Sequence, residues 1–288
     1  MDVAIQEVVR PATIAEALAT LARADARPIA GGTDLMVQLR DGRRHAACLV
    51  DLGRLGLGGV RRDGDAVEIG AATTMDTIAG DAAIRGWFPA LASAAGQVGG
   101  WPIQCRATLG GNLANGSPAA DTAGPLLIAG AGVIVVAPGG RRRVPIAEFF
   151  LGPGRTALRQ GELIAAVRLP LAEPPAGRRV VERFVKVGPR REQVISVASL
   201  AGRAVVGRDG ALEQVRIALG SVAPTPVRAT AAERALCGRR PDAAARRDAV
   251  RAVQRDIAPI DDVRAPARYR RIAVAVLLDR FLREVERG

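Results

Sequence analysis

The segment TLGGNLANGSPAADTAGPL, residues 108–126, consists largely of small and turn-forming residues. This composition predicts a loop as far as Asp121 or Thr122 and a helix only after that point. Gly110 and Gly111 leave backbone N–H groups open to an anion, and the acidic Asp121 beyond them suits a ribose hydroxyl. The segment therefore predicts a loop that binds a pyrophosphate.

A second glycine-rich turn, IAGGTDLM, covers residues 29–36 between a predicted strand and a predicted helix. Exposed N–H groups at such a turn can bind a phosphate. An ordinary, well-capped strand-to-helix turn would have the same sequence, so this octapeptide alone leaves both interpretations open. Two such loops on opposite sides of a ligand could clamp one dinucleotide.

Other nucleotide-binding and catalytic motifs are absent from the sequence. The chain's only lysine, Lys186, follows Val185, so no Gly-Lys-Ser/Thr P-loop exists. The sequence GAG at 130–132 has Val135 in place of the third glycine of a Rossmann fingerprint. Three separated cysteines and one histidine form no zinc or iron–sulfur pattern. No GxSxG elbow is present, which excludes a hydrolase of that type.

The N-terminal part alternates helices and strands. Thr13 and Glu16 form a capping box before a helix over 14–24, and Thr33 and Gly42 are expected to start and stop a helix over 33–42. A further helix is predicted over 87–100. Strands are predicted over 27–32, 48–52, 66–73, 132–138 and 162–170.

A Pro/Gly-rich connection at 172–178 predicts a domain boundary. Beyond it we expect a hairpin over 196–222 with its turn at 207–210, and then helices over 229–238, 241–257 and 266–288. In the last helix Ile272, Val276, Leu277 and Phe281 lie at helical spacing and are expected to face the core. Strands followed by helices indicate an α+β domain.

Composition restricts the partners. The net charge is +12, but the arginines are dispersed and only 3% of residues are aromatic, so a basic face that docks acidic partner subunits is favoured over nucleic-acid binding. The first residues form no secretory signal. Apolar segments such as 272–278 are too short to span a bilayer. We therefore expect a cytoplasmic protein with no transmembrane segment.

Taken together, these motifs resemble the FAD-binding medium subunit of the molybdenum hydroxylases, the xanthine dehydrogenase and aerobic carbon monoxide dehydrogenase type with a PCMH-type flavin fold. The resemblance covers essentially the whole chain. It rests on AGGTDL at 30–35, TLGGNLANGSPAAD at 108–121, GELIAAVRLP at 161–170, FVKVGPRREQVIS at 184–196 and GSVAPTPVRATAAE at 220–233.

The resemblance implies an α+β fold with a two-subdomain FAD-binding domain over residues 1–172, divided into about 1–55 and 56–172, and a C-terminal α+β domain over 178–288. It implies noncovalent FAD and no catalytic side chain. The implied cofactor-binding residues are Ile29, Ala30, Gly31, Gly32, Thr33, Asp34, Leu35, Val98, Thr108, Gly111, Asn112, Asn115, Asp121, Leu163, Ile164, Lys186 and Ile195.

In this resemblance Lys186 contacts the cofactor, where a point charge would favour the reduced, anionic flavin. Val98 and Ile195 match positions on the two sides of the flavin ring, and Leu163 or Ile164 matches a position at the adenine. Relatives have a more polar run where this chain has PIQCRA at 102–107, so the flavin contacts of that stretch stay open.

The resemblance also implies partners. Electrons from a molybdopterin large subunit would pass through a [2Fe–2S] small subunit and FAD to NAD, a quinone or oxygen. The resemblance implies that these subunits form a dimer of heterotrimers. Two other functions are kept open: a stand-alone FAD-dependent oxidase of the same fold, and a flavin-free assembly scaffold. The hydroxylated substrate is not encoded in this chain.

Overall fold

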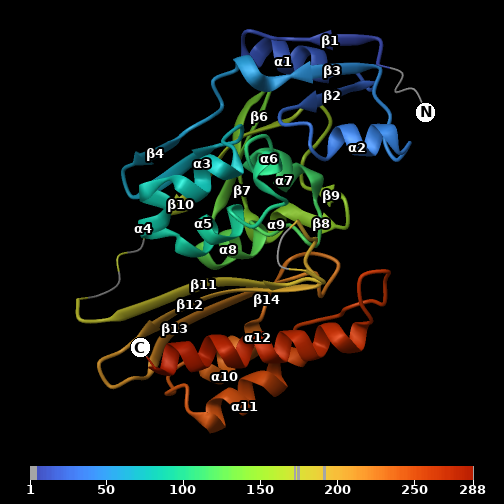
Figure 1. Cartoon of the computed structure of the whole chain (residues 1–288). Helices are drawn as coiled ribbons and strands as arrows, with labels where there is room; N and C mark the ends of the chain where they lie inside the picture. Colours follow the sequence, from blue (N-terminus) through green and yellow to red (C-terminus); the bar gives the residue numbers. More distant parts are fainter. Residues whose placement is uncertain (1–4, 172, 174–175, 191–192, 288) are drawn as a thin grey trace.

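The computed structural model describes residues 5–171, 173, 176–190 and 193–287. The boundary predicted at 172–178 therefore lies partly outside the described residues. Figure 1 shows three layers stacked along the molecule, in chain order: a small sheet with two helices, a central sheet with short helices, and a C-terminal sheet backed by a long helix.

The N-terminal layer is a three-stranded parallel sheet of order β1-β3-β2. The Thr13 side chain accepts a hydrogen bond from Glu16 N and caps α1, as predicted. The expected Thr33 cap of α2 is wrong: Asp34 occupies the N-cap position and its side chain makes no capping bond. The elements are β1 (Glu7–Val9), α1 (Ile14–Leu21), β2 (Ala26–Ile29), α2 (Leu35–Arg40) and β3 (Cys48–Asp51), followed by η1 (Leu52–Arg54).

The central layer is a five-stranded antiparallel sheet of order β4-β5-β10-β6-β7. Its strands are β4 (Val60–Asp63), β5 (Ala66–Gly70), β6 (Gly132–Ala137), β7 (Gly140–Pro145) and β10 (Leu163–Pro170), with β8 (Phe150–Gly152) and β9 (Arg155–Thr156) paired separately. Its helices are α3 (Met75–Gly80), α4 (Ala82–Trp87), α5 (Pro89–Ala95), α6 (Trp101–Gln104), α7 (Leu109–Asn115), α8 (Ala123–Ala129) and α9 (Ile146–Phe149).

The C-terminal layer is a four-stranded antiparallel sheet of order β11-β12-β13-β14, and its central hairpin is the one predicted. Helices α5 and α8 cover one face, and α10 and α12 cover the other. The elements are β11 (Arg179–Val187), β12 (Ala198–Val206), β13 (Leu212–Gly220), β14 (Val227–Arg228), α10 (Thr230–Leu236), α11 (Ala243–Ala252), η2 (Val253–Arg255) and α12 (Ala267–Arg287).

The hydrophobic cores connect the three layers. Leu163 of β10 belongs to the core under α1 and β3, and Phe184 of β11 belongs to the core of the central layer. Because apolar side chains cross both junctions, burying them favours one fixed arrangement of the layers. The pocket described below is formed where all three layers approach one another.

Three further sequence expectations are wrong in detail. The stretch 109–115 is helix α7 rather than loop, because the Thr108 side chain caps it and Gly116, at φ 63°, ends it. Phe88 interrupts the helix expected over 87–100, and a new helix begins at Pro89. In α12 Leu277 and Phe281 are buried as expected, but Ile272 and Val276 are 52% and 42% exposed.

Candidate functional site

The two glycine-rich segments lie against each other. A Cβ at Gly31 would fall 1.9 Å from Arg106 O, so only glycine allows the first turn to approach the chain just before α7. Gln38 of α2 donates through Nε2 to Asn115 Oδ1 of α7 at 2.8 Å. The convergence expected from the sequence is therefore present, and it joins the N-terminal and central layers.

A cavity of about 570 Å³ opens along this junction. Residues 194–195 of the C-terminal layer also line it. Its lining includes four arginines and two aspartates, so the wall carries an excess of positive charge that suits an anionic ligand. The lining residues that the argument uses are Ile29–Leu35, Gln38, Val98, Thr108, Gly111, Asn112, Asn115, Asp121, Ile195 and Arg264.

The first turn supplies free backbone donors. Within the described residues, the N–H groups of 31–34 have no recorded acceptor, and Gly32 has φ 73°. A left-handed residue in such a turn directs successive N–H groups toward one point, which is a concave anion site. Partial desolvation at this turn raises the pKa of the Asp34 carboxyl above its ordinary value.

The second segment does not supply free amides at the start of α7. Leu109 N donates to Thr73 O, Gly110 N to Ala71 O and Gly111 N to Thr108 Oγ1. The expectation of a clamp built from free amides of both loops is therefore wrong for these positions. What α7 contributes instead is a surface without a side chain at Gly111, and the polar side chains of Asn112 and Asn115.

Asp121 and Lys186 form a buried ion pair at the inner end of the pocket. Lys186 Nζ lies 2.7 Å from Asp121 Oδ2 and also donates to Gln97 O at 2.6 Å and Val194 O at 3.3 Å. Asp121 Oδ1 is buried and has no hydrogen-bond partner among the described residues. Burial raises the pKa of Asp121 to about 6, against the attraction of the Lys186 ammonium. An unpaired buried acceptor that lines a pocket marks where a ligand donor would bind.

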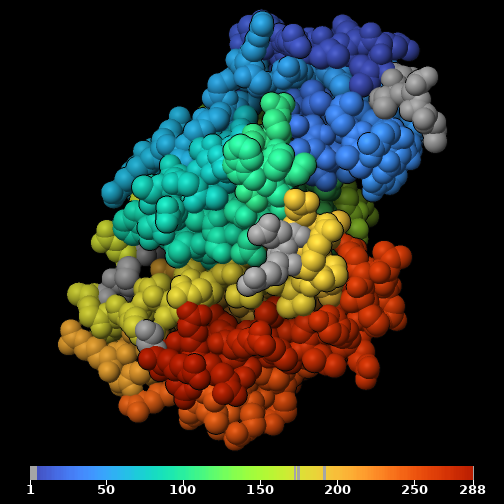
Figure 2. All heavy atoms as spheres, in the orientation of Figure 1, coloured from blue at the N-terminus to red at the C-terminus, as the bar shows by residue number. Residues whose placement is uncertain are grey.

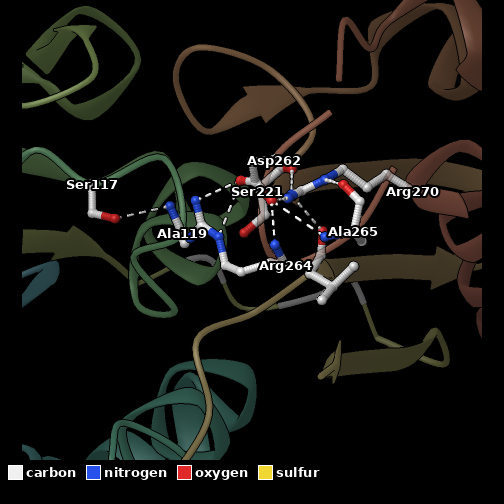
Figure 3. A network of polar contacts seen from close by, with 8 residues as sticks. Ser117, Ala119, Ser221, Asp262, Arg264, Ala265 and Arg270 are labelled. Carbon is white, nitrogen blue, oxygen red and sulfur yellow. Dashed lines mark hydrogen bonds and ion pairs between the residues drawn. The ribbon is translucent and has the colours of Figure 1, made fainter. Parts of the chain in front are cut away.

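The C-terminal layer adds Arg264 to the pocket. Figure 3 shows the polar contacts around this residue. Its guanidinium binds Asp262 Oδ2, and the backbone N–H groups of Arg264 and Ala265 bind Asp262 Oδ1. Burial opposes ionisation of Asp262, but these donors hold its pKa well below the usual range. Asp262 is thus a fixed anion that orients Arg264.

Arg270 of α12 holds the segment that contains Asp262 and Arg264 in place through buried hydrogen bonds. It is 2% exposed and donates to Asp262 Oδ1 at 2.6 Å, to Ser221 O at 2.6 Å and to Val197 O at 2.9 Å. Ser221 N in turn donates to Pro118 O, in the connection between α7 and α8. One buried guanidinium therefore holds together three C-terminal segments, at Val197, Ser221 and Asp262 (Figure 3).

Most of the residues predicted from the sequence line this pocket: Ile29, Ala30, Gly31, Gly32, Thr33, Asp34, Leu35, Val98, Thr108, Gly111, Asn112, Asn115, Asp121 and Ile195. Three are not among its lining residues. Leu163 and Ile164 are buried in separate cores on β10, and Lys186 lies behind Asp121. The Lys186 ammonium donates to two backbone oxygens and to Asp121, all within the protein. Its charge is balanced by the Asp121 carboxylate.

Sequence reasoning missed Gln38, Arg264 and Arg270. Gln38 follows the first turn by one helical turn, a signal that was available. In a chain with 41 Lys and Arg residues, two further arginines carry no signal of their own. Among the described residues no helix is long and apolar enough to cross a membrane. The same residues include no group of three or more His, Cys, Asp or Glu side chains that could hold a metal ion.

Comparison with known proteins places this geometry in a family. Residues 3–172 match the FAD binding domain in molybdopterin dehydrogenase, and residues 183–285 match the CO dehydrogenase flavoprotein C-terminal domain. The chain is 36% identical to the xanthine dehydrogenase FAD-binding subunit of Escherichia coli O157:H7, over 78% of this chain and 76% of that protein. It is 33% identical to the carbon monoxide dehydrogenase medium chain of Afipia carboxidovorans, over 94% and 93%.

Solved structures agree. A chain in the crystal structure of cyanide-inactivated Cu,Mo-CO dehydrogenase superposes with a TM-score of 0.92 at 32% identity and covers 99% of both chains. The fold and pocket define an FAD-binding protein whose relatives are dehydrogenase subunits. The chain belongs to the family of FAD-binding medium subunits of the molybdenum hydroxylases. This confirms the resemblance, the α+β fold and the FAD cofactor expected from the sequence.

Proposed function

We propose that this chain is the electron-transfer subunit of a multi-subunit molybdenum hydroxylase, and that its pocket holds FAD for electron transfer from a partner [2Fe–2S] subunit to an external acceptor. The observation that carries the proposal is one cavity lined both by residues 31–34, whose N–H groups have no acceptor among the described residues, and by Asp121, whose buried Oδ1 has no partner among them. A diphosphate needs the donors, and a sugar or ribityl hydroxyl needs the acceptor.

The chain's own residues would hold the cofactor as follows. The N–H groups of 31–34 bind phosphate oxygens, and Gly111 permits close approach from the opposite wall. Asp121 accepts a hydroxyl, while Val98 and Ile195 provide apolar contact. When bound, FAD supplies the redox chemistry, and the protein supplies position and electrostatics.

In this proposal Lys186 acts through Asp121. Its ammonium favours the ionised form of the buried carboxylate and holds Oδ2, so that Oδ1 stays available to a ligand donor. Because the pair is close to neutral, it adds little net positive charge beside the flavin. The effect of Lys186 is therefore on cofactor binding more than on the flavin potential.

The partners are proposed by analogy with relatives named as medium chains and FAD-binding subunits. A [2Fe–2S] small subunit and a molybdopterin large subunit would carry the other cofactors in a cytoplasmic dimer of heterotrimers. NAD, a quinone or oxygen would take the electrons.

Spectroscopy of the purified native complex and of the isolated chain tests this function. We expect about one FAD per chain, released intact on denaturation, and bleaching of the flavin absorbance when the reduced [2Fe–2S] partner is added to the isolated chain. A colourless complex would instead indicate an assembly scaffold. Reduction of the flavin in the isolated chain by an organic substrate, with no partner present, would indicate a stand-alone oxidase.

A further inference from the structure

The exposed side of α12 carries one continuous stripe of side chains. Tyr269, Ile272 and Val276 are 48%, 52% and 42% exposed. Arg280, Arg283 and Arg287 follow at the same three- and four-residue spacing and are also exposed. At 100° per residue these positions fall on one narrow face, opposite the buried one. Figures 1 and 2 show α12, in red, open along the viewed side of the C-terminal layer.

A cavity of about 560 Å³ runs beside the basic half of this stripe. It lies between α12 and β11, which is an edge strand of its sheet. The polar lining is five arginines and one acidic residue, namely Arg179, Arg183, Arg280, Arg283, Arg287 and Glu284.

The arginines of this groove are only partly neutralised. Arg183 pairs with Glu284 and Arg283 pairs with Asp279. Arg280 and Arg287 make no hydrogen bond or ion pair with any described residue. Arg179 donates through Nη2 to Val285 O at 2.6 Å, but its Nη1 is buried without an acceptor among the described residues. A buried guanidinium donor without an acceptor is costly, and a carboxylate is its natural partner.

We propose that the stripe and the adjoining groove form a docking surface for an acidic segment of a partner protein chain. The carboxylates of that segment bind the arginines between β11 and α12, and its apolar residues cover Tyr269, Ile272 and Val276. Charge complementarity selects an acidic partner, because the groove has four more arginines than acidic residues in its lining.

The apolar half of the stripe selects a protein rather than a nucleic acid. Arginine and aromatic residues beside exposed aliphatic side chains are typical of protein interfaces. The aliphatic side chains of Ile272 and Val276 make no favourable contact with a phosphate backbone, and a single tyrosine does not provide a stacking platform for bases. The inference rests on the proposed role of this chain as a subunit, but it concerns a surface outside the flavin pocket.

Tyr269 provides a direct reporter, because it is the only tyrosine of the chain. Nitration by tetranitromethane is measured by mass spectrometry on the native complex and on the isolated chain. We expect rapid nitration of the isolated chain and at least about tenfold slower nitration in the complex, as burial in an interface implies. Equal rates would overturn the proposal.

Charge reversal tests the basic half. Arg280→Glu with Arg287→Glu should weaken binding of the partner subunit by about tenfold or more, and should flatten the salt dependence of that binding. The matched control is Arg247→Glu on α11, an exposed arginine of the same layer that forms no ion pair with any described residue, and this variant should bind as wild type. Unchanged affinity of the double variant, or loss in the control of equal size, would contradict the proposal.

Two further readings separate the alternatives. Flavin content of every variant reports the flavin function independently, and we expect it to stay at the wild-type level because the groove and the pocket share no lining residue. A labelled random DNA duplex is the nucleic-acid probe. If the wild type binds this duplex and the double variant does not, while partner binding is unchanged, the groove is a nucleic-acid site and the proposal is overturned.

Discussion

Lys186 Nζ lies 2.7 Å from Asp121 Oδ2 and ties strand β11 of the C-terminal layer to the segment between α7 and α8. Both side chains are less than a tenth exposed. The only lysine of the chain is therefore the cation that holds the pocket carboxylate in place across a layer boundary. A buried pair of this kind is costly to break because the remaining charge stays unpaired.

Replacing Lys186 tests this relationship. Lys186→Met should lower the free energy of unfolding by about 3–5 kcal/mol, because it leaves the Asp121 carboxylate buried alone. The measurement is urea denaturation with and without added FAD. The double variant with Asp121→Asn should regain part of that stability without regaining FAD. If the two substitutions were simply additive, the proposed coupling between the residues would be absent.

The Asp121 carboxyl should make stability depend on pH. Burial raises its folded-state pKa to about 6 from the usual 3.8, so between these values the folded protein binds more protons than the unfolded chain. The free energy of unfolding of the wild type, relative to Asp121→Asn, should therefore fall as the pH rises through this window and stay constant above it. Denaturation of both proteins at several pH values measures the difference, and a flat difference would contradict the raised pKa.

The first turn should tolerate no side chain at Gly32. Gly32→Val adds a branched Cβ where φ is 73° and where the N–H groups meet the phosphate, so FAD should be released. Gly42→Val is the matched control: φ there is 68°, nothing lies within 4 Å, and the residue is outside the pocket lining. Both variants should lose similar stability, but only Gly32→Val should lose flavin absorbance. Equal FAD content in the two would argue against phosphate binding at 31–34.

The opposite wall is tested at Gly111. A Cβ there would lie 3.0 Å from Thr108 Oγ1, and the branches of Gly111→Val would project from α7 at the pocket wall. We expect lower FAD affinity with the fold retained, measured by fluorescence titration of the flavin-free protein. An Ala→Val change at the exposed Ala244 of α11 provides a control for adding a β-branched residue to a helix. Wild-type affinity in Gly111→Val would place the ligand elsewhere.

Arg270 should behave as a positioning residue. Arg270→Met removes the donors to Asp262, Ser221 and Val197, and we expect a loss of about 3–5 kcal/mol together with faster FAD dissociation. Arg270→Lys keeps the positive charge but not the planar guanidinium, so it should recover only part of the lost stability and only part of the slow FAD dissociation. Arg268→Met, two residues away and exposed, is the control. If Arg270→Met is destabilised but its rate of FAD dissociation is unchanged, the hydrogen bonds of Arg270 contribute to stability alone.

Local patterns predicted most elements because their signals are short-range. The Thr13–Glu16 cap, the strands over 66–70 and 163–170 and the hairpin of β12 and β13 follow from residues close in sequence. The helix at 109–115 was missed because its composition favours turns, while the Thr108 cap and the bonds to residues 71–73 stabilise it from outside. In α12, helical spacing alone did not show which apolar side chains, such as Ile272, face solvent.

The pocket shows the same division. Glycines at 31, 32 and 111 are visible in the sequence because glycine is required where chains or ligands approach closely. Which amides stay free was decided by tertiary bonds, since those of 109–111 are used by the protein and those of 31–34 are not. The contributions of Arg264 and Arg270 likewise come from a loop and a helix more than a hundred residues from either turn.

The sequence by itself therefore determined the family, the order of the elements and most of the residues that line the pocket. Only the tertiary structure decided that Lys186 pairs with Asp121 instead of lining the cavity, and that Asp121 Oδ1 is left without a partner. The physical reason is range: caps, turns and periodic burial depend on neighbours in the chain, whereas the partner of a buried charge depends on which distant segments the packed cores bring beside it.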